Sequence, residues 1–509
     1  MREYGFATYR HRVSASAAEP FSARPAAQPA AQPSAPIAAQ PAALWPTGLP
    51  TSLGTLRACG HAHRSVKDEV RDNLLQLLRE GKPRFPGVVG FDDTVLPDLE
   101  RALLAGHDVV LLGERGQGKT RLIRTLVGLL DEWTPVIAGS ELHEHPYEPI
   151  TPASRRRLAE LGDALPVAWV HRSDRYGEKL ATPDTSVGDL IGDVDPMKVA
   201  EGRTLGDPET IHFGLVPRTH RGIFAVNELP DLAERIQVSL LNVLEERDVQ
   251  VRGYQLRLPL DILLVASANP EDYTNRGRII TPLKDRFGAE IRTHYPLDLD
   301  LEIELVGQEA VLAAEVPDHL LEVIARFARA VRESPAVDAR SGVSARFAIA
   351  AAETVAAAAL RRAAILGEDD AVARVGDTEV VTATLRGKVE FEADGQGREI
   401  EVLDHLLRRA VAETWRGRLG GLDLHGFVDL AAEGSGVAAG EGVGSAQLLA
   451  QVGRVPGLGA VLTRLGYDDV PRPPEVAAAV EFVMEGLHLT RRLAKDVLDD
   501  GRTIYGGRQ

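Results

Sequence analysis

Short apolar runs alternate with stretches of helical periodicity between about residues 84 and 296. This alternation is typical of a parallel β-sheet whose strands are connected by helices. It predicts an α/β fold in which helices sandwich a parallel sheet. The runs that we expect to form strands are 108–112, 135–138, 167–170, 222–226, 262–266 and 289–292.

Helical periodicity dominates after this region. Residues 300–366 predict helices, with Ala-rich apolar faces at 320–331 and 347–366. Residues 371–403 fit a strand or a helix equally well. The pattern over 475–498 predicts a last amphipathic helix, which a Gly-rich tail follows.

Two segments have the composition of unfolded chain. Residues 1–56 are rich in Ala, Pro, Gln and Ser, and such a composition cannot bury enough apolar surface to fold. We expect a disordered tail there, or a start codon assigned too early. Its arginines, set among few acidic residues, also loosely fit an organelle transit peptide. The Gly-rich stretch 433–446 predicts a flexible linker.

Composition limits the class of protein. With 44% apolar residues, the 509-residue chain is long enough for two or three domains. No apolar run approaches the length of a membrane-spanning helix. The single cysteine, Cys59, excludes an internal disulfide framework and fits a reducing cytosol, so we expect a cytoplasmic protein. A net charge of −16 argues against nucleic-acid binding by charge alone.

The most specific motif is a phosphate-binding loop. The sequence GERGQGKT at 113–120 matches the pattern GxxxxGK[ST], follows an apolar run and precedes a helical pattern. Glycines let backbone N–H groups point inward around phosphates, Lys119 adds a cation near the terminal phosphates, and the Thr120 hydroxyl can bind Mg²⁺. The nucleotide-binding residues predicted in this loop are Gly113, Gly116, Gln117, Gly118, Lys119 and Thr120.

A polar pair ends the apolar run at 222–226. In a nucleotide site the first residue of such a pair supports Mg²⁺ through a coordinated water or through the loop threonine, and the second polarises the attacking water. We therefore predict an indirect Mg²⁺ role for Asn227 and a catalytic role for Glu228.

Three further polar residues follow in order along the chain. Asn269 ends the next apolar run, where its amide can hold the attacking water or the γ-phosphate. Arg286 follows a loop rich in basic residues and fits an arginine finger for a neighbouring subunit's nucleotide, a device that contributes roughly 10³ to 10⁵ in rate. Arg346 starts a predicted helix, where it can read phosphate charge.

Together these motifs resemble an AAA+ ATPase of the branch that contains the MoxR proteins and the I subunit of magnesium chelatase. Segments 181–195 and 214–223 resemble the insert into helix 2 of that branch. Residues 239–247 resemble the helix that follows, and 249–257 resemble the hairpin before sensor 1. The resemblance covers about residues 84–366.

The resemblance implies ATP and Mg²⁺ as cofactors and a homo-oligomeric ring, often a hexamer, with ATP between subunits. It divides the chain into a tail at 1–56, an AAA+ α/β nucleotide-binding domain at 57–299, a helical lid domain at 300–370 and a mostly helical C-terminal region at 371–509. The roles it implies are Walker A for Lys119 and Thr120, Walker B for Glu228, sensor 1 for Asn269, arginine finger for Arg286 and sensor 2 for Arg346.

One residue departs from the pattern of this family. Its Walker B pair is commonly Asp-Glu, and Asn227 removes a negative charge near Mg²⁺ while it keeps an oxygen acceptor. Because Thr120 and the phosphates also hold the metal, and Glu228 is intact, we expect slowed rather than abolished hydrolysis.

The function that these observations predict is an ATP-hydrolysing ring that remodels or activates a separate protein partner. After residue 370 the sequence lacks an Asp-x-Ser-x-Ser motif of the integrin I type, which argues against a true metal-chelatase motor subunit. The alternatives are a nucleotide-gated scaffold with little turnover and a DNA-linked AAA+ activator. The acidic charge and the lack of a recognisable helix-turn-helix argue against the activator.

Residues 59–63 and 143–145 contain the ligand types Cys and His at close spacing. Together they could hold a transition metal. Because no second CxxC or HxxxH motif supports such a site, we expect exposed loop residues instead.

Overall fold

The structure is a computed structural model. It describes residues 46–195, 197, 210–246, 249–251, 254–256, 258–270, 278–338, 342–392, 397–432, 436–467, 470–498 and 501–506. Most of the tail predicted at 1–56, part of the insert, the end of the helix at 239–247, the turn of the hairpin at 249–257 and the start of the linker at 433–446 lie outside the described residues.

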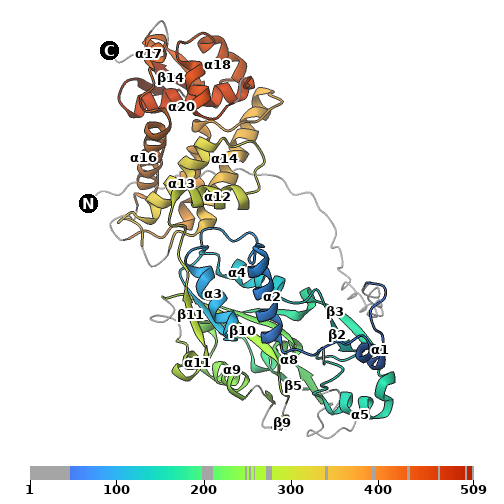
Figure 1. The fold of residues 1–509 in the computed structure, drawn as a ribbon. Helices are drawn as coiled ribbons and strands as arrows, with labels where there is room; N and C mark the ends of the chain where they lie inside the picture. The colour runs from blue at the N-terminus through green and yellow to red at the C-terminus, as the bar shows by residue number, and fades with distance from the viewer. Residues whose placement is uncertain are drawn as a thin grey trace, which may run out of the picture. The chain divides into compact units, whose positions relative to one another are not determined.

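The central sheet has five parallel strands among the described residues, in the order β11-β1-β10-β7-β4 (Figure 1). The strands are β1 (Val109–Leu112), β4 (Tyr176–Leu180), β7 (Gly222–Asn227), β10 (Ile262–Ala268) and β11 (Ala289–Arg292). The predicted parallel α/β fold is confirmed.

Both faces of this sheet are buried. Along β1, Val109 and Leu111 belong to one core cluster, whereas Val110 and Leu112 belong to another. Helices α2, α3 and α4 contribute to the first cluster, and α9 and α11 contribute to the second. A strand that is buried on both faces is a nearly continuous apolar run, which explains why the sequence pattern located these strands.

Two of the predicted strands are present but lie outside this sheet. The runs at 135–138 and 167–170 form β2 (Trp133–Ile137) and β3 (Val167–His171), a separate antiparallel pair. The fifth strand of the main sheet is instead β4, which has no apolar run because it lies at the sheet edge and is mostly half-buried. The remaining short strands are β5 (Gly192–Val194), β6 (Ile211–Phe213), β8 (Val249–Val251) and β9 (Tyr254–Leu256), which form two antiparallel hairpins.

The helices of the α/β region are listed here by their bounds: α1 (Leu53–Ala58), α2 (Val66–Glu80), α3 (Val95–Leu104), α4 (Lys119–Thr125), α5 (Pro152–Leu161), α6 (Val187–Leu190), α8 (Leu215–Arg218), α9 (Glu234–Glu246) and α11 (Thr281–Arg286). Short 3-10 helices are η1 (Leu126–Leu129), η2 (Gly162–Ala164), η3 (Arg172–Arg175) and η5 (Leu229–Asp231).

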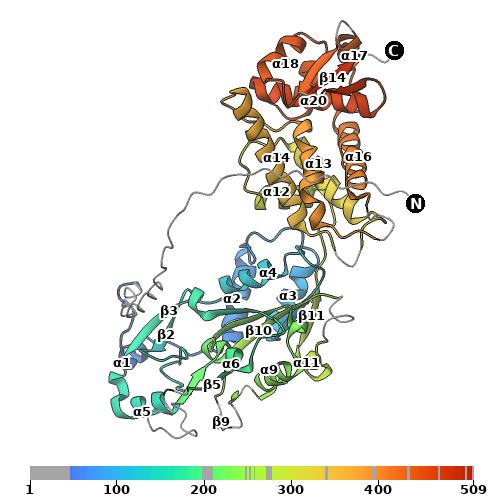
Figure 2. The ribbon, with the colours of Figure 1, turned by 180° about the vertical axis from the view of Figure 1, so that it is seen from behind.

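The folded chain begins before the boundary expected at residue 57. In α1, Leu53 is fully buried and its backbone N–H donates to the carbonyl of Leu165 at 2.9 Å. Leu53, Leu165 and Ile137 form a small core that joins α1 to β2 (Figures 1 and 2). The partners of Leu53 in this core are far from it in sequence, so the composition of residues 1–56 could not predict the contact.

The rest of the chain is mostly helical. Its helices are α12 (Leu299–Glu309), α13 (Asp318–Arg332), α14 (Ala345–Leu366), α15 (Val380–Leu385), α16 (Glu399–Leu419), α17 (His425–Ala432), α18 (Ser445–Val452), α19 (Leu458–Arg464) and α20 (Pro473–Leu489), with 3-10 helices η6 (Val375–Thr378) and η7 (Arg386–Lys388). The helices predicted over 300–366 are confirmed. The ambiguous segment 371–403 is helical at α15, and Phe391 forms an isolated antiparallel bridge with Val337.

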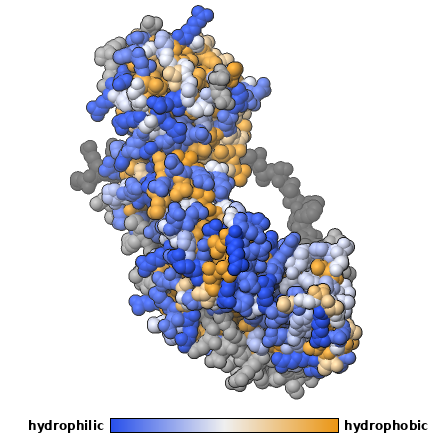
Figure 3. Space-filling view, in the orientation of Figure 1, coloured by the Kyte–Doolittle hydropathy of each residue, from blue (hydrophilic) through white to orange (hydrophobic). Residues whose placement is uncertain are grey.

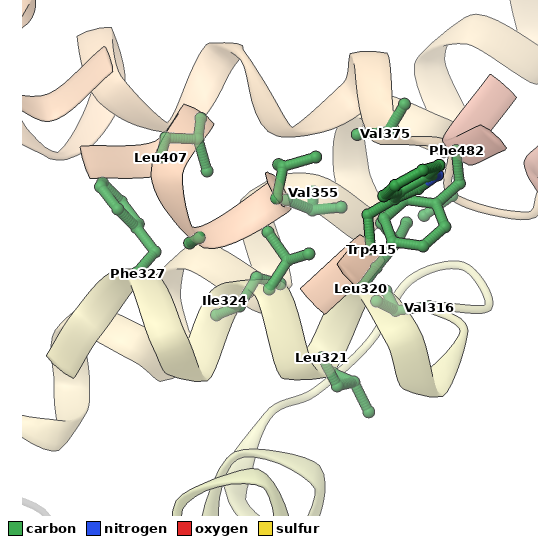
Figure 4. Packing of buried hydrophobic residues seen from close by; sticks show 14 of the residues in the cluster. Val316, Leu320, Leu321, Ile324, Phe327, Val355, Val375, Leu407, Trp415 and Phe482 are labelled. Atoms are coloured by element: carbon green, nitrogen blue, oxygen red, sulfur yellow. The ribbon is translucent and has the colours of Figure 1, made fainter. Parts of the chain in front are cut away.

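One hydrophobic core runs through this helical region. Ile324 of α13 and Val355 of α14 belong to the same cluster as Leu407 and Trp415 of α16 and Phe482 of α20 (Figure 4). The boundary expected at residue 370 therefore does not separate two cores. The lid helices and the C-terminal helices share one hydrophobic interior.

The C-terminal end contains a small antiparallel sheet that the sequence did not predict. Its strands are β12 (Val437–Gly440), β13 (Ala494–Val497) and β14 (Arg502–Gly506), with β14 in the centre. The described part of the predicted linker thus holds a strand, in which Val437 and Ala439 are buried. The helix expected over 475–498 ends at Leu489, close to Arg491, which has a left-handed φ of 64°.

Within the described residues, every helix is too short or too polar to cross a bilayer. On the face drawn in Figure 3, hydrophilic residues predominate and hydrophobic residues form smaller patches between them.

Candidate nucleotide-binding site

The loop between β1 and α4 has the backbone shape of a phosphate-binding loop. Gly116 has a positive φ of 76°, and an added Cβ there would lie 2.0 Å from the Cβ of Ser344. A Cβ at Gly113 would lie 2.0 Å from the Thr293 hydroxyl oxygen. These two positions accept only glycine because neighbouring segments approach the loop backbone closely.

Lys119 is held over this loop. Its side chain is buried, and its ammonium group donates to the carbonyl oxygens of Gly113 and Glu114, the latter at 2.8 Å, and to Oδ1 of Asn269 at 2.8 Å. These three acceptors are neutral oxygens, so they orient the ammonium group without neutralising its charge.

Gln117 fastens the loop to the end of β11. The Thr293 hydroxyl donates to Oε1 of Gln117 at 2.7 Å, and both side chains are buried. This bond fixes a loop side chain from a neighbouring strand of the sheet, which helps to keep the loop preformed.

The end of β7 lies beside the start of α4. Oδ1 of Asn227 accepts hydrogen bonds from the hydroxyls of Thr120 at 3.4 Å and Ser267 at 3.3 Å. Its Nδ2 donates to Oε1 of Glu178 at 2.7 Å. The expected pairing of Asn227 with the loop threonine is therefore present in the structure.

Glu178, on β4, is a site residue that sequence reasoning missed. The Arg124 guanidinium donates to both of its carboxylate oxygens, at 2.8 and 2.9 Å, and the Tyr176 hydroxyl donates at 3.0 Å. The bond from Arg124 is the largest influence that holds the pKa of Glu178 below its ordinary value. Because β4 has no apolar run, no sequence pattern indicates that this carboxylate lies next to Asn227.

Glu228 follows β7 in a strained conformation. Its φ of 56° and ψ of 48° lie in the left-handed region, which is uncommon for residues other than glycine. Its backbone N–H donates to the Ser267 hydroxyl at 3.2 Å, and Nδ2 of Asn269 donates to its carboxylate at 2.6 Å. Asn269 thus connects the Glu228 carboxylate with the Lys119 ammonium group.

A cleft of about 730 Å³ opens beside the loop. Residues 115–121 and Glu228 line one part of it. Val88 and Val89 from the N-terminal side, and Ile349 from α14, add apolar lining. The cleft therefore combines polar loop atoms with an apolar wall, as pockets for small ligands usually do.

Known proteins are similar to parts of this chain. The family model of the Sigma-54 interaction domain matches residues 203–286. The magnesium-chelatase 38 kDa subunit of Acidiphilium rubrum is 32% identical over 207 residues, which cover 39% of this chain and 54% of that protein. The chloroplastic magnesium-chelatase subunit ChlI-1 of Arabidopsis thaliana is 28% identical over 245 residues, 46% of this chain and 53% of that protein. These matches support the resemblance to AAA+ ATPases of the branch that contains the MoxR proteins and the magnesium chelatase I subunits.

The similarity has a limited extent. The chain spans about half the length of the curated relatives it matches. A solved complex between subunits BchI and BchD of magnesium chelatase matches with a TM-score of 0.33 at 20% identity, over 64% of this chain and 98% of that chain.

The two arginines predicted for the nucleotide site lie in different places. Arg346, in the first turn of α14, is exposed and lines the cleft. Arg286, the last residue of α11, is exposed and forms an ion pair with Asp285 at 3.3 Å. It is absent from the described residues that line the cleft. The structure therefore brings Arg346 to the loop of its own chain and leaves Arg286 outside it.

The histidines predicted as exposed loop residues instead form a cluster. Nε2 of His61 lies 3.2 Å from Nε2 of His145, and the ring of His63 lies 4.3 Å from that of His145, which is buried. The backbone N–H of Tyr147 donates to Nδ1 of His145 at 3.0 Å, so the neutral ring carries its proton on Nε2 and cannot bind a metal there. Among the described residues, no group of three Cys, His, Asp or Glu side chains is arranged to hold a metal.

Burial explains the protonation state of this cluster. The pKa of His145 is lowered to about 2, mainly because the ring is buried and next because of the positive charge of Arg221. Burial likewise lowers the pKa of His220 to about 3. We conclude that this cluster is a neutral, hydrogen-bonded part of the fold.

Proposed function

We propose that this chain binds Mg-ATP in the cleft beside the phosphate-binding loop and hydrolyses it. In this proposal the chain is one subunit of a homo-oligomeric ring of six, and the ring remodels a separate protein partner. The observation that supports this most strongly is the continuous connection from Lys119 through Asn269 to Glu228. It joins a phosphate-binding cation to a carboxylate through one amide, directly beside the loop.

The residues present fit a magnesium ion. Mg²⁺ takes oxygen ligands and usually keeps several waters, together with substrate phosphates. Thr120 and Asn227 place two neutral oxygens next to each other at the start of α4. In this proposal Thr120 would hold the metal and Asn227 would support it indirectly, and a bound Mg²⁺ would supply positive charge against the phosphates.

The remaining roles follow from position. Lys119 binds the terminal phosphates, and Arg346 contacts them from α14 on the other side of the cleft. Glu228 accepts a proton from the attacking water, and Asn269 holds that carboxylate in place. Arg286 acts on the nucleotide of the neighbouring subunit, consistent with its exposed position outside the cleft of its own chain.

The test is Mg²⁺-dependent release of phosphate from ATP, measured over a range of protein concentrations. The Glu228→Gln variant serves as the matched control because it keeps the size of the side chain and removes the base. We expect turnover that rises as subunits assemble and that the variant lacks. Equal phosphate release by the parent and the variant would overturn the motor proposal.

A second candidate is a nucleotide-gated scaffold with little turnover. The neutral side chain of Asn227 favours it, because less negative charge supports the metal. Such a scaffold would assemble with ATP in a size measurement yet release almost no phosphate at the same concentration. A ring ATPase would assemble with ATP and would also release phosphate at that concentration.

A further inference from the structure

The Glu178 carboxylate accepts a hydrogen bond from the side-chain amide of Asn227 at 2.7 Å. It lies on β4, which pairs with β7 so that Leu180 is opposite Asn227. Arg124 and Tyr176 donate three hydrogen bonds to it, and Asn227 donates a fourth. These partners hold the carboxylate in one orientation.

An asparagine at this position raises a problem that an aspartate does not. The two oxygens of a carboxylate are equivalent, whereas an amide has an acceptor end and a donor end. If the amide turned over, its NH₂ group would face Thr120, and a donor cannot support a cation. Asn227 therefore needs a neighbour that selects one of its two orientations.

The hydroxyl neighbours of Asn227 cannot make that selection. Thr120 and Ser267 each have a hydroxyl that can donate or accept, so either end of the amide would satisfy them. An ionised carboxylate only accepts hydrogen bonds. Glu178, at 2.7 Å from Nδ2, is thus the contact that distinguishes the two ends.

We propose that Glu178 is a positioning residue that turns the oxygen of Asn227 toward Thr120 and so keeps the site able to support Mg²⁺ in spite of the missing aspartate. This inference rests on the proposed function. It also explains why an aspartate would not simply improve the site: a carboxylate at residue 227 would meet the Glu178 carboxylate, and the two like charges would repel each other.

The first test is the Glu178→Gln variant. Glutamine has both a donor and an acceptor, so the selection is lost. The measurement is the affinity for a fluorescent ADP analogue, titrated with Mg²⁺ and repeated in EDTA. We expect the Mg²⁺ requirement to rise about tenfold, the scale seen for residues that orient metal ligands, while the affinity in EDTA stays the same.

The second test restores the pairing with its polarity reversed. In the double variant Glu178→Gln/Asn227→Asp, the glutamine can donate to the new carboxylate. We expect its Mg²⁺ requirement to return at least to that of the parent. The single Asn227→Asp variant, which places two carboxylates in contact, should gain less than the same change gains in the Glu178→Gln background.

The matched control is Glu141→Gln, which breaks an exposed ion pair with Arg218 of 3.0 Å and leaves the Asn227 contacts intact. All variants are compared by thermal unfolding without nucleotide. A Glu178→Gln protein that is folded and has the Mg²⁺ requirement of the parent would overturn the inference. Equal effects of Asn227→Asp in both backgrounds would do the same. A parent whose ADP binding ignores Mg²⁺ would overturn the proposed function and, with it, this inference.

Discussion

Asn269 contacts two charged groups at once. Its Oδ1 accepts from the Lys119 ammonium group, and its Nδ2 donates to the Glu228 carboxylate. One amide therefore positions the groups that we assign to phosphate binding and to water activation. The backbone of Glu228 is left-handed, and Asn269 is one of the groups that direct its carboxylate.

We expect Asn269→Ala to separate binding from hydrolysis. Lys119 keeps its bonds to two loop carbonyls, so nucleotide affinity should change little. Glu228 loses the donor that orients it, and turnover should fall about 10²-fold, the lower end of what a general base contributes. Nucleotide titration and phosphate release on the same preparation check this. A parallel loss of affinity would show that Asn269 acts mainly through Lys119.

The buried histidines predict a dependence of stability on pH. The folded pKa of His145, about 2, lies below the ordinary value of 6.5, so the unfolded chain takes up a proton that the folded chain excludes. The contribution of neutral His145 to the free energy of unfolding is complete above pH 6.5. Below pH 6.5 this contribution falls by about 1.4 kcal/mol per pH unit.

Urea unfolding between pH 7.5 and 5 should therefore show a falling free energy of unfolding. The His145→Asn variant keeps an acceptor near the Tyr147 N–H and has no group that titrates in this range. Its slope should be smaller by about 1.4 kcal/mol per pH unit. A remaining slope is expected from His220, whose pKa is lowered to about 3. An unchanged slope in the variant would contradict the assignment.

At the scale of elements, helices α16 and α20 approach each other closely. A Cβ added at Gly486 of α20 would lie 2.0 Å from the Trp415 ring of α16. Gly486→Ala should thus overpack the core and lower the free energy of unfolding by about 1 to 3 kcal/mol. Gly417→Ala, at an exposed position of α16 with no atom nearby, should instead stabilise the helix by about 0.5 to 1 kcal/mol. Urea unfolding of both variants checks the opposite signs.

The elements also show what a sequence can and cannot predict. Strands β1, β7 and β10 are apolar because they are buried on two faces, so the pattern located them and with them Asn227, Glu228 and Asn269. Strand β4 lies at the edge of the sheet, next to β7. This neighbourhood depends on the order of the strands in the folded sheet, which the apolar pattern does not specify. Glu178 and Asn227 are 49 positions apart in sequence and meet only because of that order, so Glu178 could not be predicted.

At the scale of the whole molecule, the proposed site is shared between subunits. Arg346 lines the cleft of its own chain, whereas Arg286 does not. If Arg286 completes the site of a neighbour, each active site takes Lys119 from one chain and the arginine from another.

A mixing experiment tests this sharing. We expect Lys119→Ala to lose nucleotide binding and Arg286→Ala to lose turnover about 10³-fold, each as a pure protein. A mixture of the two variants should regain part of the turnover, because some interfaces combine an intact Lys119 with an intact Arg286. A mixture that stays as inactive as its components would show that Arg286 does not act across an interface.

The core shared by α13, α14, α16 and α20 has a mechanical consequence. At the start of α14, Ser344 lies against Gly116 of the phosphate-binding loop, and Arg346 lines the cleft beside it. Closely packed interiors resist deformation, so helices that share one interior shift together. A shift of the loop at Gly116 would therefore move these helices together, as one body whose core extends to Tyr505.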